Sequence, residues 1–169
     1  MSKASKNTSR RKLFTVGSDA PFQFVEAYKS LRTNLQFCGE DKKVIAVTSC
    51  TPNEGKSSVS MQLGISLAES GKRVILIDAD LRKSVLLGRT KTQKSVRGLA
   101  HFLSGQATLE DVICSTNVKN FYMIYSGPFP PNPAELLGGK NFRSLLNALR
   151  KVYDYVIVDT PPLGSVIDS

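Results

Sequence analysis

The sequence predicts an α/β fold in which a parallel β-sheet is covered by helices on both faces. Short apolar runs alternate with amphipathic segments along most of the chain, and each apolar run is nearly continuous. Strands of this kind are buried on both sides, which requires helices above and below the sheet. The length of 169 residues corresponds to one domain with a sizeable core.

Four strands are expected, and each is a short apolar run that ends at a polar or turn residue. They cover residues 43–48, 73–77, 121–125 and 155–158. The run at 43–48 is expected to be as buried as the other three.

Helices are predicted in most of the intervening segments. Residues 23–37 place apolar side chains at helical spacing behind Pro21, which suits a helix start. A second helix over 56–70 is ended by Gly71. Three shorter or later helices are expected at 95–103, 109–113 and 142–152. The segment GPFPPNP, residues 127–133, is expected to be irregular because proline fixes φ and lacks a backbone donor.

A basic flexible N-terminal arm, residues 1–20, is expected to precede one domain over 21–169. The net charge of +9 is concentrated there, without an acidic residue among the first dozen. Such an arm can meet nucleic acid or an anionic membrane surface, but a solvated tail is the interpretation we favour. No basic patch interleaved with aromatic residues follows, so no nucleic-acid partner is expected. The basic residues of the arm are Lys3, Lys6, Arg10, Arg11 and Lys12.

The remaining composition excludes several classes of protein. Cys38, Cys50 and Cys114 are far apart and form no C-x-x-C pair, so reduced thiols and no zinc site are expected. The single histidine, His101, is expected to be structural. No apolar run approaches the roughly 20 residues of a membrane span, and no signal-peptide core is visible, which predicts a cytoplasmic protein.

The stretch TSCTPNEGKSS, which follows the first strand, matches most of the phosphate-loop template G-x-x-x-x-G-K-[ST]. Gly55, Lys56 and Ser57 fit, whereas Cys50 stands where the template has glycine. Successive N–H groups at a helix start form an anion cradle, and Asn53 and Gly55 both tolerate positive φ. Lys56 is expected to reach the terminal phosphates and Ser57 to bind Mg²⁺. For the loop alone, a plain strand-to-helix turn remains the alternative.

Three aspartates lie at the carboxyl ends of two predicted strands. Asp78 and Asp80 follow the second strand, and Asp159 follows the fourth. Ligands of open parallel sheets bind at this edge. Carboxylates beside a phosphate loop can hold Mg²⁺, and another carboxylate can accept a proton from an attacking hydroxyl. A single aspartate after a strand is usually a cap or turn residue. Three of them beside the loop predict nucleotide and Mg²⁺ binding.

From Phe24 to its end the chain resembles the bacterial tyrosine kinases (BY-kinases) of capsule and exopolysaccharide loci. TSCTPNEGKSS is similar to the family's Walker A motif, which often lacks the first glycine. DADLR is similar to its second Walker motif, A′, and VIVDTPP to its Walker B motif. SGPFPPNPAELL matches a family stretch near the active site. EAYKSLRTNLQF resembles the helix with E-x-x-R-x-x-R that assembles a ring.

The resemblance implies a P-loop NTPase that uses ATP and Mg²⁺ to phosphorylate tyrosine hydroxyls. It places Lys56 on the β- and γ-phosphates and Ser57 on Mg²⁺. Asp78 is expected near the metal, Asp80 near the incoming hydroxyl, and Asp159 at the metal's waters. Arg82 is expected to complete the A′ site. The loop residues expected to bind the nucleotide are Pro52, Asn53, Glu54, Gly55, Lys56, Ser57 and Ser58.

The partners implied by the resemblance are a membrane adaptor of the polysaccharide copolymerase type, protein tyrosine substrates and further copies of this chain. The adaptor would recruit the kinase to the inner face of the cell membrane. The homo-oligomer would form through the helix that carries Glu26, Lys29 and Arg32. Lys29 replaces the first arginine of the ring motif and loses its planar fork, so a weaker interface is expected.

Members of this family continue well beyond the position of Ser169, so the sheet is expected to be incomplete at the C-terminus. The chain would correspond to the N-terminal two-thirds of a kinase, without the tyrosine-rich tail. It is expected to be a poor autokinase that tends to associate. Its own tyrosines are expected to pack in the core rather than accept phosphate. They are Tyr28, Tyr122, Tyr125, Tyr153 and Tyr155.

Two other functions remain open. The first is a P-loop switch ATPase of the partitioning or septum-positioning type, whose loop carries an extra lysine near its start. Here that region reads Cys50-Thr51-Pro52 and has none. The second is a non-catalytic kinase fragment that acts only by binding.

Overall fold

The computed structural model describes residues 13–14, 22–39, 41–90 and 96–164, and its centre is a six-stranded sheet. The strand order is β1-β4-β5-β3-β6-β2. All neighbouring strands are parallel except β4 and β5, which are antiparallel. The strands are β1 (Leu13–Phe14), β2 (Val44–Val47), β3 (Val74–Asp78), β4 (Cys114–Thr116), β5 (Phe121–Ile124) and β6 (Tyr155–Asp159).

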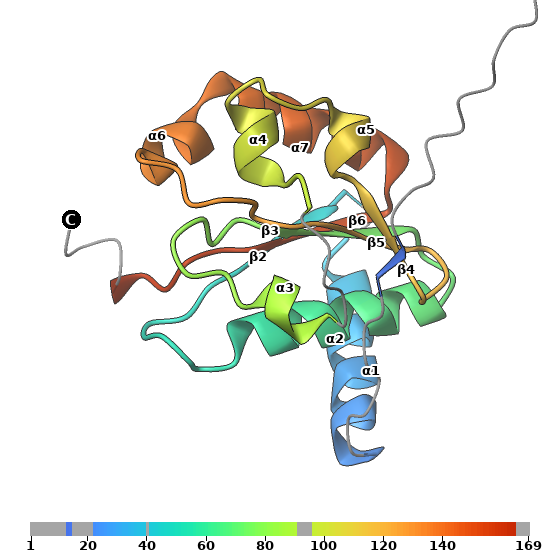
Figure 1. The fold of residues 1–169 in the computed structure, drawn as a ribbon. Coiled ribbons are helices and arrows are strands. Elements are labelled where there is room, and N and C mark those ends of the chain that lie inside the picture. The colour runs from blue at the N-terminus through green and yellow to red at the C-terminus, as the bar shows by residue number, and fades with distance from the viewer. Residues whose placement is uncertain (1–12, 15–21, 40, 91–95, 165–169) are drawn as a thin grey trace, which may run out of the picture.

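Helices cover both faces of this sheet, as predicted (Figure 1). The helices are α1 (Phe22–Phe37), α2 (Lys56–Glu69), α3 (Leu86–Arg89), α4 (Leu99–Leu103), α5 (Leu109–Val112), α6 (Pro133–Gly138) and α7 (Lys140–Val152). The first three lie on one side of the sheet and the other four on the opposite side.

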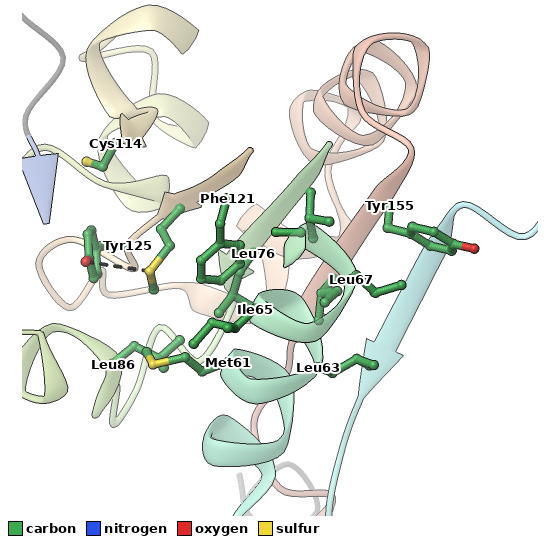
Figure 2. Close-up of a cluster of buried hydrophobic side chains, with 14 residues drawn as sticks. Met61, Leu63, Ile65, Leu67, Leu76, Leu86, Cys114, Phe121, Tyr125 and Tyr155 are labelled. Carbon is green, nitrogen blue, oxygen red and sulfur yellow. Dashed lines mark hydrogen bonds between the residues drawn. The ribbon is translucent and has the colours of Figure 1, made fainter. Parts of the chain in front are cut away.

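The apolar runs of the strands supply both cores, because successive side chains point to opposite faces. Leu76 of β3 packs on the α2 side with Leu67 and Phe121, as Figure 2 shows. Ile75 and Ile77 of the same strand pack on the other side, against α4 and α7. All five residues of β3 are buried, which confirms the prediction of a strand covered on both faces.

The predicted burial of β2 is wrong. The run at 43–48 is not buried like the other strands, because β2 lies at the edge of the sheet and pairs only with β6 among the described residues. Its residues alternate between exposed and half-buried, and Val44 keeps 40% of its surface exposed. An apolar run alone cannot distinguish a central strand from an edge strand.

Several elements were not predicted. β4 is only three residues long, and α3 only four, so neither produces a periodic pattern. α6 begins at Pro133, the last residue of the segment predicted to be irregular, because proline is favoured at the first position of a helix. α4 begins at Leu99, later than the predicted start at residue 95, which lies outside the described residues.

Two residues of the predicted N-terminal arm, Leu13 and Phe14, form β1 and pair with β4. The five basic residues of the arm lie outside the described part of the chain. Within that part, no helix is long and apolar enough to cross a bilayer.

The single histidine has a structural role, as predicted. Nδ1 of His101 accepts the N–H of Gly98 at 3.1 Å, so the ring caps the start of α4. Cys38, Cys50 and Cys114 are free thiols. Three of the five tyrosines, Tyr125, Tyr153 and Tyr155, are buried, and Tyr28 and Tyr122 are half-buried.

Candidate functional site

The phosphate loop connects the carboxyl end of β2 to the first turn of α2. Asn53 has a φ of 66° and Gly55 a φ of 91°, so two left-handed residues turn the chain into the helix. The carbonyl of Gly55 accepts the N–H of Val59 at 2.9 Å and starts the helical hydrogen bonds. The N–H groups of the first turn therefore have no acceptor within the helix, which is the arrangement that binds anions.

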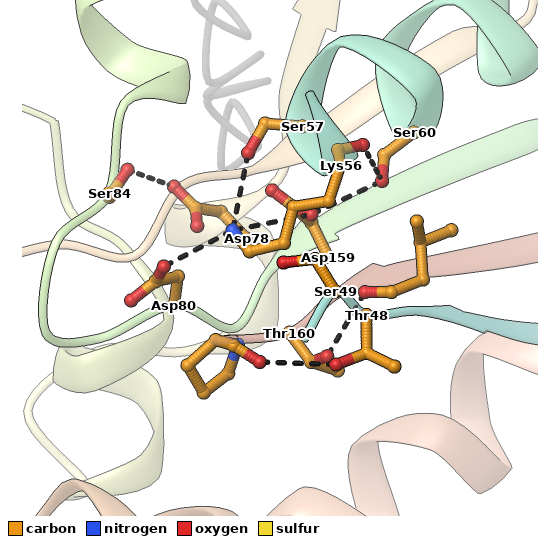
Figure 3. A network of polar contacts seen from close by, with 12 residues as sticks. Thr48, Ser49, Lys56, Ser57, Ser60, Asp78, Asp80, Ser84, Asp159 and Thr160 are labelled. Atoms are coloured by element: carbon orange, nitrogen blue, oxygen red, sulfur yellow. Dashed lines mark hydrogen bonds and ion pairs between the residues drawn. The ribbon is translucent and has the colours of Figure 1, made fainter. Parts of the chain in front are cut away.

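Lys56 is held by two aspartates, one just after β3 and one at the end of β6 (Figure 3). Its Nζ lies 3.2 Å from Oδ2 of Asp80 and 3.8 Å from Oδ1 of Asp159. The same atom lies 3.4 Å from Oγ of Ser57. The side chain of Lys56 is only 11% exposed, so these carboxylates screen its charge in place of water.

Asp78 and Asp159 lie side by side because β3 and β6 pair in register at these two residues. Burial raises the pKa of Asp78 to about 7, opposed by the hydrogen bond from Ser84 and reinforced by the neighbouring carboxylates. Burial also raises the pKa of Asp159, and Lys56 acts against this shift. Ser60 donates to Oδ1 of Asp159 at 3.2 Å.

Each of these two buried carboxylates has one oxygen without a hydrogen bond to the described residues. The oxygens are Oδ1 of Asp78 and Oδ2 of Asp159. Buried polar atoms of this kind require an explanation, and an unobserved ion is one of the common ones. Carboxylate oxygens are preferred ligands of Mg²⁺, so the pair fits a divalent cation next to Ser57 and the phosphate loop.

Asp80 is fixed differently from the other two aspartates. Its Oδ1 accepts the backbone N–H groups of Arg82 at 3.3 Å and of Lys83 at 3.0 Å. Its Oδ2 faces Lys56, and the residue lines the open cavity. Among Asp78, Asp80 and Asp159, Asp80 is thus the one that lines the cavity.

A cavity of about 510 Å³ opens over the loop. Seven of the predicted site residues line it, whereas Asp78 and Asp159 lie buried beneath, and Glu54 and Ser58 are not among its lining residues. The carboxylate of Glu54 instead accepts the N–H of Cys50 at 3.0 Å and the hydroxyl of Thr51 at 2.8 Å. The lining residues are Pro52, Asn53, Gly55, Lys56, Ser57, Asp80, Arg82, Lys83, Val85, Arg89, Pro161 and Pro162.

Sequence reasoning missed several residues of the site. Ser60 follows Lys56 by one helical turn, a spacing that could have indicated it. Ser84, Lys83 and Arg89 lie in an irregular segment and a four-residue helix, where no periodicity indicates which side chains turn inward. Arg89 donates from Nη1 to Oγ of Ser58.

A mostly parallel sheet with a lysine-bearing phosphate loop and buried aspartates at its carboxyl edge defines a P-loop nucleoside-triphosphate-binding domain. The family model described as "AAA domain" matches residues 42–169. The tyrosine-protein kinase CpsD of Streptococcus pneumoniae serotype 4 is 46% identical over 144 residues, which cover 85% of this chain and 63% of the relative. The chain therefore belongs to the AAA-domain proteins, and within them it is similar in sequence to bacterial proteins named tyrosine-protein kinase.

Solved structures agree with this assignment. The kinase domain of the Escherichia coli tyrosine kinase ETK superposes with a TM-score of 0.78 at 39% identity, over 85% of this chain and 57% of that one. The septum site-determining protein MinD of Pyrococcus horikoshii, solved with Mg-ADP, gives a TM-score of 0.59 at 27% identity, over 71% of this chain and 49% of that one. The chain is thus similar to MinD, but more similar to the tyrosine kinase domain. It spans about 63% of the length of the curated relative CpsD.

Proposed function

We propose that this chain binds Mg·ATP and transfers its γ-phosphate to tyrosine hydroxyls in capsular or exopolysaccharide synthesis. The observation that carries the proposal is that Lys56 of the phosphate loop lies against Asp80 and Asp159, and that Asp159 is paired with Asp78 across β3 and β6. The relatives named tyrosine-protein kinase support the reaction class, and membership of a P-loop family implies nucleotide binding.

Each side chain has a role that its surroundings permit. Lys56 exchanges its contact with Asp80 for the β- and γ-phosphates. The loop N–H groups from Asn53 to Ser58 bind the same phosphates. The oxygens of Asp78 and Asp159 that lack hydrogen bonds would hold Mg²⁺ together with Ser57. When bound, Mg²⁺ would neutralise phosphate charge and orient the γ-phosphate. Glu54 supports the loop from behind through Cys50 and Thr51.

Asp80 is the group that we assign to the acceptor. The bond between the γ-phosphorus and the β,γ-bridging oxygen breaks, and ADP keeps that oxygen. The tyrosine oxygen forms the new bond to phosphorus, and its proton passes to Oδ2 of Asp80. Oδ1 is held by two backbone N–H groups, so the carboxylate is positioned before the acceptor arrives. Arg82 follows on the same turn and completes the site.

The partners are part of the proposal. We assign a membrane adaptor of the polysaccharide copolymerase type, which would hold the kinase at the inner face of the membrane, and a homo-oligomer formed through α1. Lys29 pairs with Glu26 at 2.8 Å, and Arg32 donates to the carbonyl of Ser66 in α2 at 2.9 Å. Both cations of the ring motif are therefore already bound within one chain, so a ring contact would have to share or replace these bonds.

The experiment is phosphotransfer in trans. The chain is incubated with labelled Mg·ATP and a random Glu-Tyr copolymer, and phosphotyrosine and free phosphate are both measured. We expect phosphotyrosine formation, reduced at least about 100-fold in Asp80→Asn with ATP binding retained. Phosphate release without phosphotyrosine would indicate a switch ATPase. ATP binding with neither product would indicate a binding fragment, and either result would contradict the kinase proposal.

A further inference from the structure

Arg89 lies at the nucleotide cavity but belongs to none of the motifs that identify the site. It is the last residue of α3, and its neighbours fix its place. Leu86 at the start of the helix is fully buried in the core on the α2 side. Thr90, directly after it, is buried and donates to the carbonyl of Leu87 at 2.9 Å. Two buried anchors therefore hold Arg89 at the rim of the cavity.

The guanidinium of Arg89 points at the first turn of α2. Its Nη1 donates to Oγ of Ser58, which is two residues after Lys56. Ser58 belongs to the loop that binds phosphate in the proposed function. A guanidinium at this place is therefore within reach of the same anion as the loop N–H groups. Its planar fork of donors matches phosphate oxygens in a bidentate way.

The charges of the site indicate a use for this arginine. The buried set of Asp78, Asp80 and Asp159 with Lys56 carries two excess negative charges when fully ionised, which one Mg²⁺ would balance. A nucleoside triphosphate then brings roughly four further negative charges, because phosphate groups are largely ionised at neutral pH. The remaining cations that line the cavity are Arg82, Lys83 and Arg89. Asp80 is the one carboxylate among the described lining residues and lies against Lys56, whereas Arg89 bonds to the hydroxyl of Ser58.

We propose that Arg89 is a phosphate-binding residue of the nucleotide site, which exchanges its hydrogen bond to Ser58 for the triphosphate. The proposal rests on the proposed nucleotide site. Arg89 contributes a bidentate contact from α3, opposite the loop, and its departure leaves the Ser58 hydroxyl available to the same phosphates. Lys83 supports it as a point charge on the same segment. Binding of an acidic residue of the acceptor by Arg89 is the competing role, and the test separates the two.

The test measures the binding of a fluorescent ATP analogue and its displacement by ATP and by inorganic tripolyphosphate, which has phosphates but no base. The variants are Arg89→Ala, Arg89→Lys, and Arg143→Ala as a matched control on the exposed face of α7. We expect Arg89→Ala to weaken both competitors about tenfold and Arg89→Lys to weaken them less. The salt dependence of binding should also become less steep in Arg89→Ala, as expected when one phosphate contact is lost. Arg143→Ala should behave as the wild type.

Equal tripolyphosphate binding by Arg89→Ala and the wild type would overturn the proposal. The same holds if Arg89→Ala binds ATP normally but phosphorylates the Glu-Tyr copolymer poorly, because that result assigns Arg89 to the acceptor. Lys56→Met separates a failure of the nucleotide site from a failure of the role proposed for Arg89. If Lys56→Met loses ATP binding while Arg89→Ala does not, only the role of Arg89 is wrong. If the wild type binds no nucleotide, both proposals fail.

Discussion

Asp78 and Asp159 are directly paired across β3 and β6, and at most 1% of the surface of each residue is exposed. Two carboxylates from neighbouring strands thus share one low-dielectric site, each with one oxygen that accepts no hydrogen bond from the described residues. Without a cation this arrangement is costly, because like charges repel and burial disfavours both. Its presence beside the phosphate loop is the strongest structural argument for a metal-dependent function.

The first prediction concerns this pair. Asp78→Asn and Asp159→Asn should weaken Mg·ATP binding by roughly 10- to 100-fold, the range typical for groups that hold or position a metal. Binding of ATP in EDTA should change little or improve, because a negative charge near the phosphates is removed. The check is nucleotide titration with and without Mg²⁺. Normal Mg·ATP binding by both variants would identify the residues as turn and packing residues.

The second prediction is a pH dependence of stability without metal. The pKa of Asp78 is about 7 in the folded protein and 3.8 when unperturbed. The folded state therefore holds a proton between these values that the unfolded chain has lost, so this residue destabilises the fold increasingly as the pH rises from about 4 to 7, and the effect levels off above pH 7. Between pH 5.5 and pH 8 the wild type should lose about 2 kcal/mol relative to Asp78→Asn.

Chemical denaturation in EDTA at both pH values measures this difference. Saturating Mg²⁺ should reduce it, because the cation favours the ionised carboxylate. A difference that does not change with pH would show that Asp78 ionises normally in the folded state.

The sequence predicted the layers of the fold and the central residues of the site. It did not predict which strands form the edges of the sheet, nor the peripheral residues of the site. β3 and β6 were predicted because uninterrupted apolar runs of four residues are typical of strands buried on both faces, and the aspartates that follow them were predicted to meet. The edge position of β2 and the antiparallel β4 depend on tertiary pairing, which periodicity does not encode. Arg89 and Ser84 were missed because their positions depend on the path of an irregular segment.

The third prediction concerns α1. Arg32 donates to the Ser66 carbonyl, and Tyr28 and Leu35 are the partly buried α1 residues that pack on the core. Arg32→Ala should raise hydrogen exchange in α1 about tenfold, since a hydrogen bond from a charged group contributes about 1.5 kcal/mol or more. Lys29→Ala is the control, because its pair with Glu26 is exposed and contributes little. Equal exchange in both variants would mean that the Arg32 bond does not hold α1.

The fourth prediction tests the packing that positions α4. A Cβ on Gly98 would lie 2.4 Å from the backbone N of Gly127 and the carbonyl oxygen of Tyr125. Gly98→Ala should therefore lower the free energy of unfolding by roughly 2 kcal/mol or more. Gly138→Ala in α6 meets no atom within 4 Å and should be neutral or stabilising by up to about 1 kcal/mol. Denaturant unfolding of both variants is the measurement, and similar stabilities would contradict the close approach.

The central claim is that Lys56 binds the phosphates of ATP, and calorimetric titration of Mg·ATP into Lys56→Met tests it most directly. Lys42→Met is the matched control, since Lys42 is exposed and pairs with Asp41 at 2.6 Å. The account predicts ATP binding by the wild type and by Lys42→Met. It predicts binding at least about 100-fold weaker in Lys56→Met, because the charge-assisted bonds to phosphate are lost, with an unchanged circular dichroism spectrum. Equal affinity of Lys56→Met and the wild type for Mg·ATP would contradict it.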